Sequence, residues 1–263
     1  MTPTWKRALV TGASSGIGEV IVRRLAAEGP DLVVVARDRK RLEALAMELS
    51  TSHGVAVEVL RADLSKKAGV TSVVERLQDE TAVVDFLVNN AGFGTYGPFI
   101  DLDPDEEARE IEVNCQALVR LCHAAAPGMV RRRHGTVLNV SSLAARAATP
   151  NNAVYAATKA FVSHFSDALH EELRGSGVTV TVVEPGFTRT EFQARAGIDS
   201  SEVPGFLWQE AATVVDHALR AYDKGRAVCV PGPLNSATAA FTAITPHAVT
   251  RRIAGVIVNK SEK

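Results

Sequence analysis

Short runs of aliphatic and β-branched residues alternate with longer amphipathic stretches along most of the chain. The run DLVVVA at 31–36 is almost continuously apolar, which is typical of strands buried on both faces of a sheet. This alternation predicts an α/β fold, with one doubly wound parallel sheet of about seven strands and helices on both faces. The expected strands cover 7–11, 31–36, 55–60, 84–90, 135–142, 178–185 and 227–230, and the expected helices cover 16–28, 39–50, 66–79, 104–132, 153–174 and 210–223.

Length and composition limit the classes of protein to which the chain can belong. Its 263 residues suit one large α/β domain, and no linker or repeat interrupts them, so a single domain is expected over 1–263. Hydrophobic residues make up 46% of the chain, which fits a globular protein. The formal net charge of -1 gives no reason to expect nucleic acid as a partner.

Cysteine content and apolar runs bear on compartment and membrane contact. Cys115, Cys122 and Cys229 contain no CxxC pair, which argues against disulfides and predicts buried thiols, no metal site and a cytoplasmic protein. No run of about 18 uncharged apolar residues is present, so no transmembrane span is expected. The apolar stretch that begins SATAAFTAITPH is expected to pack on the body or on a neighbouring subunit rather than on a membrane.

Two glycine-rich segments compete as the site for the phosphates of a dinucleotide. GFGTYG at 92–97 matches G-x-G-x-x-G letter for letter, but Pro98 follows at once and no strand arrives about 20 residues later. TGASSGIG at 11–18 does not match that pattern, yet it follows the first expected strand and opens the first expected helix. Its glycines allow a tight turn, Ser14 and Ser15 add hydroxyl donors, and the helix N-terminus supplies free N–H groups. The sequence therefore predicts phosphate binding at 11–18.

The end of the second expected strand distinguishes NADP from NAD. Arg37 stands 19 residues past Gly18, where a ribose-recognising residue belongs. A cation there suits the 2′-phosphate of NADP through charge-assisted hydrogen bonds. Asp38 is a contrary sign, and the cations at 39–41 are also consistent with a solvated helix start. We expect NADP(H), with NAD(H) as the alternative.

Tyr155 and Lys159 are four residues apart at the start of an expected helix, so their side chains project from one face. An unperturbed tyrosine is a poor base at neutral pH, and an adjacent ammonium lowers its pKa. Ser142 ends the strand GTVLNVSS thirteen residues earlier and can hydrogen-bond a carbonyl oxygen. Asn114 lies in the middle of an expected helix, where a buried amide needs partners and can kink the helix or hold a water. Together these residues predict acid/base chemistry.

These motifs, in this order from about residue 5 to 190, resemble the compact form of the short-chain dehydrogenases/reductases. TGASSGIG is similar to the family's T-G-x-x-x-G-x-G, NNAG to its N-N-A-G, VNCQA to its helix asparagine, VSS…YAATK to its serine and Y-x-x-x-K pair, and PGFTRT to its P-G strand end. The chain departs from the family at Thr158, where serine is usual, and at Ala145, where glycine is frequent. The second departure leaves the shape of the substrate-side loop in doubt.

The resemblance implies a single-domain Rossmann fold, with a cofactor half at about 5–135 and a catalytic and substrate half at about 136–263. It also implies an oxidoreductase that interconverts a ketone or aldehyde and an alcohol by hydride transfer. Tyr155 would exchange a proton with the substrate oxygen, Lys159 would lower the pKa of Tyr155 and bind the nicotinamide ribose, Ser142 would polarise the carbonyl, and Asn114 would hold a proton-relaying water.

The expected cofactor-binding residues combine the first glycine-rich turn, Arg37 and the positions that the resemblance carries over. Asp63 and Leu64 would lie by the adenine, and Pro185, Gly186 and Thr188 would fix the nicotinamide end. The full set is Gly12, Ser14, Ser15, Gly16, Ile17, Gly18, Arg37, Asp63, Leu64, Asn90, Ala91, Gly92, Tyr155, Lys159, Pro185, Gly186 and Thr188.

The segment 187–208 follows the sixth expected strand, where the family forms a lid over the substrate. Packing on the body is an equally weighted interpretation of its apolar side chains, which are Phe192, Val203, Phe206, Leu207 and Trp208. With Phe93, Tyr96, Leu143 and Phe187 as further lining residues, we expect a small, apolar carbonyl, lipid or acyl substrate. The alternatives are a non-catalytic dinucleotide-binding regulator and a membrane-associated scaffold. In the family, long helices such as 104–132 and 153–174 pair between subunits, which implies a homodimer or homotetramer.

Overall fold

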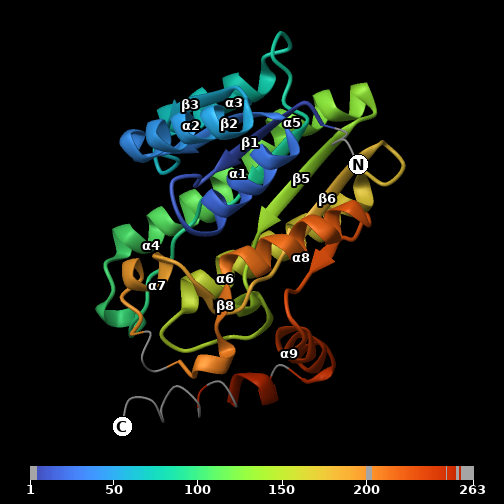
Figure 1. Ribbon diagram of the computed structural model, residues 1–263. Helices are drawn as coiled ribbons and strands as arrows, with labels where there is room; N and C mark the ends of the chain where they lie inside the picture. Colours follow the sequence, from blue (N-terminus) through green and yellow to red (C-terminus); the bar gives the residue numbers. More distant parts are fainter. Residues whose placement is uncertain (1–4, 200–202, 247, 253–254, 256–263) are drawn as a thin grey trace.

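The computed structural model describes residues 5–199, 203–246, 248–252 and 255 (Figure 1). Seven strands form one sheet in the order β3-β2-β1-β4-β5-β6-β9, and every neighbouring pair is parallel. The order reverses between β1 and β4, which is where ligands bind in doubly wound folds. The strands are β1 (Arg7–Thr11), β2 (Asp31–Ala36), β3 (Val57–Arg61), β4 (Phe86–Asn89), β5 (Gly135–Val140), β6 (Val178–Val183) and β9 (Val228–Cys229).

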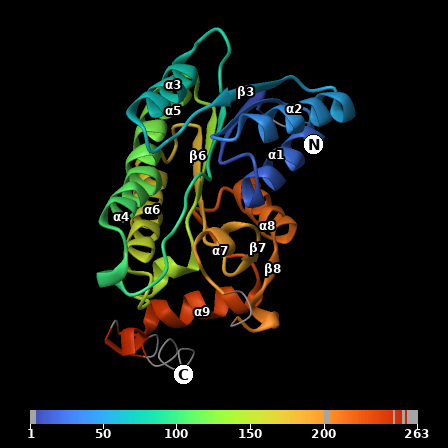
Figure 2. The same cartoon turned by 90° about the vertical axis from the view of Figure 1, so that its left-hand side faces the viewer.

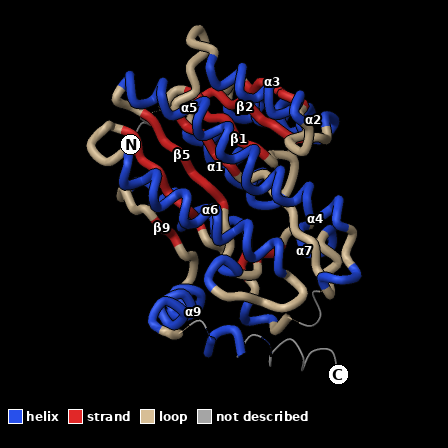
Figure 3. Tube along the Cα trace, turned by 180° about the vertical axis from the view of Figure 1, so that it is seen from behind, coloured by secondary structure: helices blue, strands red, loops and turns tan. Residues whose placement is uncertain are grey.

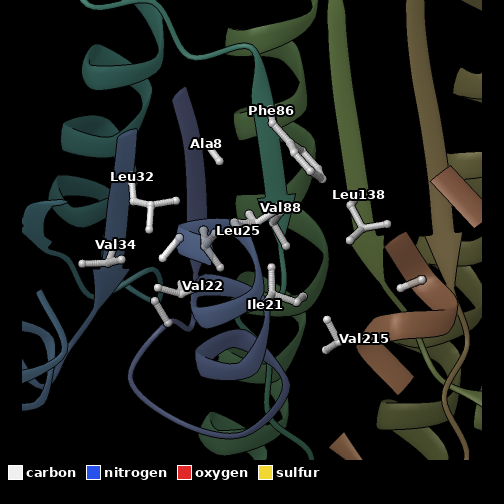
Figure 4. Packing of buried hydrophobic residues seen from close by; sticks show 14 of the residues in the cluster. Ala8, Ile21, Val22, Leu25, Leu32, Val34, Phe86, Val88, Leu138 and Val215 are labelled. Atoms are coloured by element: carbon white, nitrogen blue, oxygen red, sulfur yellow. The ribbon is translucent and has the colours of Figure 1, made fainter. Parts of the chain in front are cut away.

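Helices cover both faces of this sheet, as the sequence predicts (Figure 2). One face carries α1 (Gly16–Glu28), α2 (Arg39–His53) and α8 (Ala211–Asp223). The other carries α3 (Lys67–Gln78), α5 (Leu118–Arg132) and α6 (Ala153–Glu172). On the first face, Ile21 and Leu25 of α1 pack against Val88 of β4 (Figure 4). Burial of these aliphatic side chains is the main force that holds the layers together.

Helix ends follow the capping signals of the sequence. Asp103 accepts a hydrogen bond from the backbone N–H of Asp105 at the start of α4 (Pro104–Ile111), and Asp38 accepts one from Arg41 at the start of α2. Gly29 ends α1 with φ at 98°, in the left-handed region that favours glycine. Asp38 therefore caps a helix, which explains a carboxylate at this position without a role in ribose binding.

The expected helix over 104–132 is interrupted, which is the main correction to the predicted elements. A π-helical turn, η2 (Glu112–Ala117), separates α4 from α5. Such turns occur mostly at functional sites, and this one contains Asn114.

Further elements were not predicted. They are the two-stranded sheet of β7 (Thr188–Arg189) and β8 (Gln209–Glu210), the helices α7 (Phe192–Arg195) and α9 (Pro233–Ile244), and the short 3-10 turns η1 (Phe99–Asp101), η3 (Leu143–Arg146) and η5 (Gly205–Leu207).

The carboxyl ends of the strands, α7 and α9 lie at the same end of the molecule (Figures 1 and 3). Helix α9 belongs to the apolar C-terminal stretch and packs beside η3, so this part of the stretch lies on the body, although Phe241 stays 52% exposed. The end of the stretch, at 256–260, lies outside the described residues. Within the described ranges, no helix combines the length and apolar character that a membrane span requires.

Candidate active site

The turn TGASSGIG lies between β1 and α1, as predicted for a phosphate-binding loop. Gly12 and Gly16 have φ angles of 66° and 60°, which side chains rarely adopt. A Cβ at Gly18 would lie 2.3 Å from the carbonyl oxygen of Gly12 and 2.4 Å from Nδ2 of Asn90. Asn90 donates to the carbonyl oxygens of Thr11 and Gly12 at 2.9 and 3.2 Å. At Gly18 the loop therefore packs so closely on Gly12 and on Asn90, the residue after β4, that only glycine fits there.

The second glycine-rich loop, 92–97, lies against the catalytic candidates instead. A Cβ at Gly94 would lie 2.6 Å from Cδ2 of Tyr155. A Cβ at Gly92 would lie 2.9 Å from Oδ1 of Asn114 and 3.3 Å from Nζ of Lys159. The structure thus brings residues that are far apart in the sequence to one place, and the glycines let the backbone approach them.

Tyr155 and Lys159 both lie in the first turns of α6. Lys159 is 5% exposed, and its Nζ donates to the carbonyl oxygen of Val140 at 3.0 Å and lies 5.6 Å from the ring centroid of Tyr155. Ser142 begins η3, where its Oγ accepts from the backbone N–H of Ala144 at 3.1 Å, and it also hydrogen-bonds the side chain of Tyr155. Three of the four predicted catalytic side chains therefore converge after β5.

Burial dominates the acid/base properties of this pair. It raises the pKa of Tyr155 to about 12, with the hydrogen bond to Ser142 acting in the opposite direction and the charge of Glu110 in the same one. Lys159 is not among the groups that shift this pKa, so a lowering of the Tyr155 pKa by Lys159 stays a prediction. Burial lowers the pKa of Lys159 to about 8, and the carboxylate of Glu110 opposes that shift. At pH 7 the tyrosine is protonated and the lysine is mainly a cation.

Asn114 joins the second glycine-rich loop to α6. Its Oδ1 accepts from the backbone N–H of Phe93 at 3.2 Å, and its Nδ2 donates to the carbonyl oxygen of Phe93 at 2.9 Å and to Oγ1 of Thr158 at 3.0 Å. Thr158 in turn donates to the carbonyl oxygen of Tyr155 at 2.8 Å. Thr158 stands where serine is usual in the family, and its hydroxyl group takes part in both of these hydrogen bonds. The protein satisfies the Asn114 amide, and a water held by this residue stays a prediction.

Ser141, the residue before Ser142, has different contacts from Ser142. It donates to the carbonyl oxygen of Lys159 at 2.7 Å and lies 2.9 Å from Oγ of Ser163. Ser163 donates to Glu184, whose other oxygen accepts from Arg146 at 2.6 Å. This chain of buried polar groups fixes the end of β5 to α6, and it engages Arg146 as an ion-pair partner.

A pocket of about 430 Å³ lies beyond the ends of β2 and β3. Its lining includes Arg37, Arg61 and Asp63. Although burial acts to raise the pKa of Asp63, hydrogen bonds from Ser65 and the charge of Arg37 lower it overall. Arg61 was not predicted, and the β2–β3 register explains why it matters, since Ala36 pairs with Arg61 and so brings it beside Arg37.

The other expected cofactor residues are less uniform in their surroundings. Leu64 is buried in the apolar core rather than in the wall of that pocket. Pro185 accepts a hydrogen bond from the backbone N–H of Leu143 at 2.8 Å, and a Cβ at Gly186 would lie 2.6 Å from Nδ2 of Asn235 in α9. Further along the same segment, the methyl group of Thr190 would lie 3.2 Å from a Cβ at Gly16. The 185–190 segment therefore connects the first glycine-rich loop to η3.

The segment 187–208 shows features of both interpretations, a lid over the substrate and packing on the body. The ring of Phe192 lies 5.4 Å from that of Tyr155, so this residue borders the catalytic centre. Phe187 and Trp208 pack on one another at 5.7 Å, and the guanidinium of Arg189 lies over the Trp208 ring. Phe206 is 76% exposed. The segment therefore covers the site with Phe192 and presents Phe206 to solvent, while 200–202 lie outside the described residues.

The three cysteines are free and buried, as expected. Burial raises the pKa of Cys115 and of Cys229 to about 11 and that of Cys122 to about 12, so none is a thiolate at neutral pH. Among the residues that the structure describes, no group of three or more His, Cys, Asp or Glu side chains could hold a metal ion.

Sequence reasoning missed one acidic cluster next to the site. Glu107 and Glu110 are buried beside Thr95 of the second glycine-rich loop. Their spacing was the available signal, because 107, 110 and 114 lie on one face of a helix. The doubly wound sheet, the glycine-rich turn after β1 and the pairing of Tyr155 with the buried Lys159 are the features expected of an oxidoreductase that binds a nicotinamide dinucleotide.

Comparisons with known proteins specify which oxidoreductases these are. The family model for short chain dehydrogenase matches residues 6–200. A short chain dehydrogenase of Pseudocercospora fijiensis is 36% identical over 191 residues, which is 72% of this chain and 62% of the relative, so the chain spans less than two thirds of that protein. The chain belongs to the short-chain dehydrogenase family.

Solved structures agree with this assignment. A short-chain dehydrogenase from Sphingobium yanoikuyae in complex with NADPH is 39% identical, with a TM-score of 0.82 over 92% of this chain and 97% of that one. A bulky-bulky ketone specific alcohol dehydrogenase from Comamonas testosteroni is 31% identical, with a TM-score of 0.79 over 92% of this chain and 96% of that one.

Proposed function

We propose that the protein is an NADP(H)-dependent oxidoreductase that interconverts an apolar ketone or aldehyde and the corresponding alcohol, with Tyr155 as the general acid/base. The observation that carries this proposal is the convergence of Ser142, Tyr155 and Lys159 after β5, with Asn114 fixing the loop packed against Tyr155. An arrangement of this kind supports proton transfer to an oxygen held between the serine and tyrosine hydroxyls.

The residues present fit a dinucleotide. The glycine-rich turn at 12–18 presents the N-terminus of α1, which suits a pyrophosphate. Arg37 and Arg61 line the pocket where a 2′-phosphate would be held, and Asp63 lies beside them for the adenosine. A bound nicotinamide supplies or accepts the hydride. The NADPH complex of the Sphingobium relative supports the choice of NADP.

Proton transfer follows from the charges of the site. Because burial keeps the pKa of Tyr155 near 12, its phenol is protonated at neutral pH and can donate to a carbonyl oxygen. Ser142 donates a second hydrogen bond to that oxygen, and the Lys159 ammonium lies close enough to stabilise the phenolate that is left.

An apolar side chain beside Tyr155 indicates the class of substrate. Phe192 beside Tyr155 offers an apolar wall, which suits a ketone with hydrophobic substituents. The Comamonas neighbour's preference for bulky ketones supports the same class.

Ile111 and Phe161 are 43% and 44% exposed on the predicted pairing helices, which supports a homodimer or homotetramer. Light scattering on the purified protein measures that state.

The decisive experiment is a screen of apolar ketones and alcohols with NADPH, NADP, NADH and NAD, followed through the nicotinamide absorbance. Any substrate found is then tested with the Tyr155→Phe variant, for which we expect a loss of at least about 100-fold in kcat. Full turnover by this variant would show that Tyr155 is not the acid. Tight NADPH binding with no turnover across the screen would favour the non-catalytic regulator instead.

A further inference from the structure

Two acidic residues of α4 lie buried behind the catalytic side chains, and the proposed mechanism does not use them. Glu110 is 0% exposed and Glu107 is 7% exposed. Glutamate is almost never fully buried unless it is paired. Yet Arg109 on the same helix pairs with the neighbouring Glu106, and no cation forms an ion pair with either buried carboxylate in the described part of the chain. Their burial therefore needs another explanation.

Thr95, in the second glycine-rich loop, lies between the two carboxylates. Its backbone N–H donates to Oε2 of Glu110 at 3.0 Å, and its Oγ1 lies 3.1 Å from the same oxygen. The same Oγ1 also hydrogen-bonds Oε1 of Glu107. The other oxygen of Glu110 faces Nδ2 of Asn114 at 3.5 Å. These contacts thus connect Glu107, Thr95 and Glu110 in a row that ends at Asn114.

The number of protons in this cluster can be counted. A threonine hydroxyl has one hydrogen to donate and two lone pairs that accept. Thr95 can therefore satisfy one carboxylate as a donor, and the contact with the second is a hydrogen bond only if that carboxyl group carries a proton. Two bare carboxylates on one buried hydroxyl would repel each other with little water to screen them. The geometry is that of two acids that share one proton.

Several other groups face Glu110 from the elements packed around it. Lys159 and Tyr155 face it from α6, Cys115 from η2 and Glu107 from its own helix. Burial raises the pKa of Glu110 to about 7, with hydrogen bonds from Thr95 opposing the shift and the charge of Glu107 adding to it. Lys159 is the one cation among these neighbours, and the Glu110 carboxylate acts to keep it charged.

We propose that Glu107, Thr95 and Glu110 hold one shared proton at neutral pH, and that Glu110 is a positioning residue whose charge controls the charge of Lys159. The statement about Lys159 rests on the proposed function, whereas the shared proton does not. When Glu110 loses its proton, the ammonium of Lys159 gains a counter-charge and persists to higher pH. The second glycine-rich loop, which holds Thr95, thereby couples its own position to the charge of the site.

The coupling predicts different effects for two similar substitutions. Glu110→Gln removes the counter-charge, so the pKa of Lys159 falls and activity ends at a lower pH. Glu107→Gln removes the charge that keeps Glu110 protonated, so Glu110 ionises at a lower pH. Because Glu110 is already ionised in the parent protein where Lys159 titrates, the alkaline limb of the pH profile stays in place in Glu107→Gln. A purely structural role for the two acids would change rates without moving the alkaline limb in Glu110→Gln.

The first measurement needs no substrate or cofactor. A carboxyl group whose pKa is raised by folding destabilises the fold as pH rises from the unfolded value, near 4.5, to the folded value, about 7. We therefore expect the melting temperature of Glu110→Gln, relative to the parent protein, to increase by several degrees from about pH 5 to about pH 8. Glu112→Gln is the matched control, since Glu112 is exposed in the adjoining turn. A difference that is flat with pH overturns the shared proton, whether or not the protein turns over any substrate.

The second measurement uses a ketone found with the parent protein, and it follows kcat/KM against pH with NADPH saturating. We expect the alkaline limb to move down by about half a pH unit in Glu110→Gln and to stay in place in Glu107→Gln. An unchanged limb in Glu110→Gln, or an equal downward shift in both variants, overturns the coupling to Lys159. If Glu110→Gln does not fold, Glu107→Gln serves the first measurement, because its melting temperature relative to the parent is also expected to rise with pH.

Discussion

The two glycine-rich loops, 11–18 and 92–97, lie at neighbouring strand ends and use glycine for different reasons. In the first loop the glycines allow left-handed backbone at Gly12 and Gly16 and close backbone contact at Gly18. In the second loop, the glycine at 94 makes room for the ring of Tyr155. A glycine pattern therefore indicates a close approach, and only the surrounding elements show whether a cofactor or a side chain makes it.

The strongest test of this difference is Gly18→Ala in the first loop. Its new methyl group would lie 2.3 Å from the Gly12 carbonyl oxygen, so the backbone of the turn must move. We expect a loss of about 2 kcal/mol in stability from this overpacking, and a loss of at least about 100-fold in NADPH affinity because the turn is displaced. Thermal unfolding and fluorescence titration with NADPH measure the two effects.

Gly29→Ala is the control for conformational strain alone. Gly29 also has a positive φ, at 98°, but a Cβ there meets nothing within 4 Å. We expect a modest loss of stability and unchanged NADPH affinity. If both variants bound NADPH like the parent, the first loop would not be the phosphate site.

The second loop is tested by Gly94→Ala, with a smaller expected effect on binding. A methyl group 2.6 Å from Cδ2 of Tyr155 displaces the ring, which can tilt where backbone cannot. We expect kcat to fall about 100-fold while NADPH affinity changes less than about twofold, since misplaced catalytic groups are costly. The control is Gly205→Ala, where a Cβ meets nothing and φ is ordinary. Equal losses of binding and turnover in Gly94→Ala would show that both loops hold the cofactor.

Most of the fold could be predicted because the strands are local signals. The apolar runs at 7–11 and 31–36 coincide with β1 and β2, and 16–28 coincides with α1. A kink at Asn114 was one of two interpretations of that residue, but the π-helical turn itself could not be predicted, because the amide of Asn114 bonds Phe93 and Thr158, which lie far away in the sequence. Helix α9 was missed because its residues include no charged side chain to mark a polar face.

The site could be predicted only in part, because some of its properties depend on contacts between residues that are far apart in the sequence. Spacing and resemblance identified Ser142, Tyr155 and Lys159, which the fold brings together. The net rise in the pKa of Tyr155 could not be predicted from the sequence, because its main cause is burial, which depends on tertiary packing. Arg61 required the β2–β3 register.

The smallest of these expected effects belongs to Arg37, which follows β2 and lies in neither glycine-rich loop. Arg37 is exposed, lines the pocket with Arg61 and has no carboxylate in an ion pair among the described residues, whereas Arg39 pairs with Glu43 and Arg41 with Glu191. We expect Arg37→Ala to weaken NADPH binding about 10-fold, with NADH binding and kcat unchanged, because a single charge-assisted contact to a phosphate is removed. Arg39→Ala is the matched control and should change neither affinity. Since the contact is exposed, the difference between Arg37→Ala and the parent should shrink as salt is added. Better turnover with NADH than with NADPH in the parent protein would contradict the assignment of Arg37 to the 2′-phosphate.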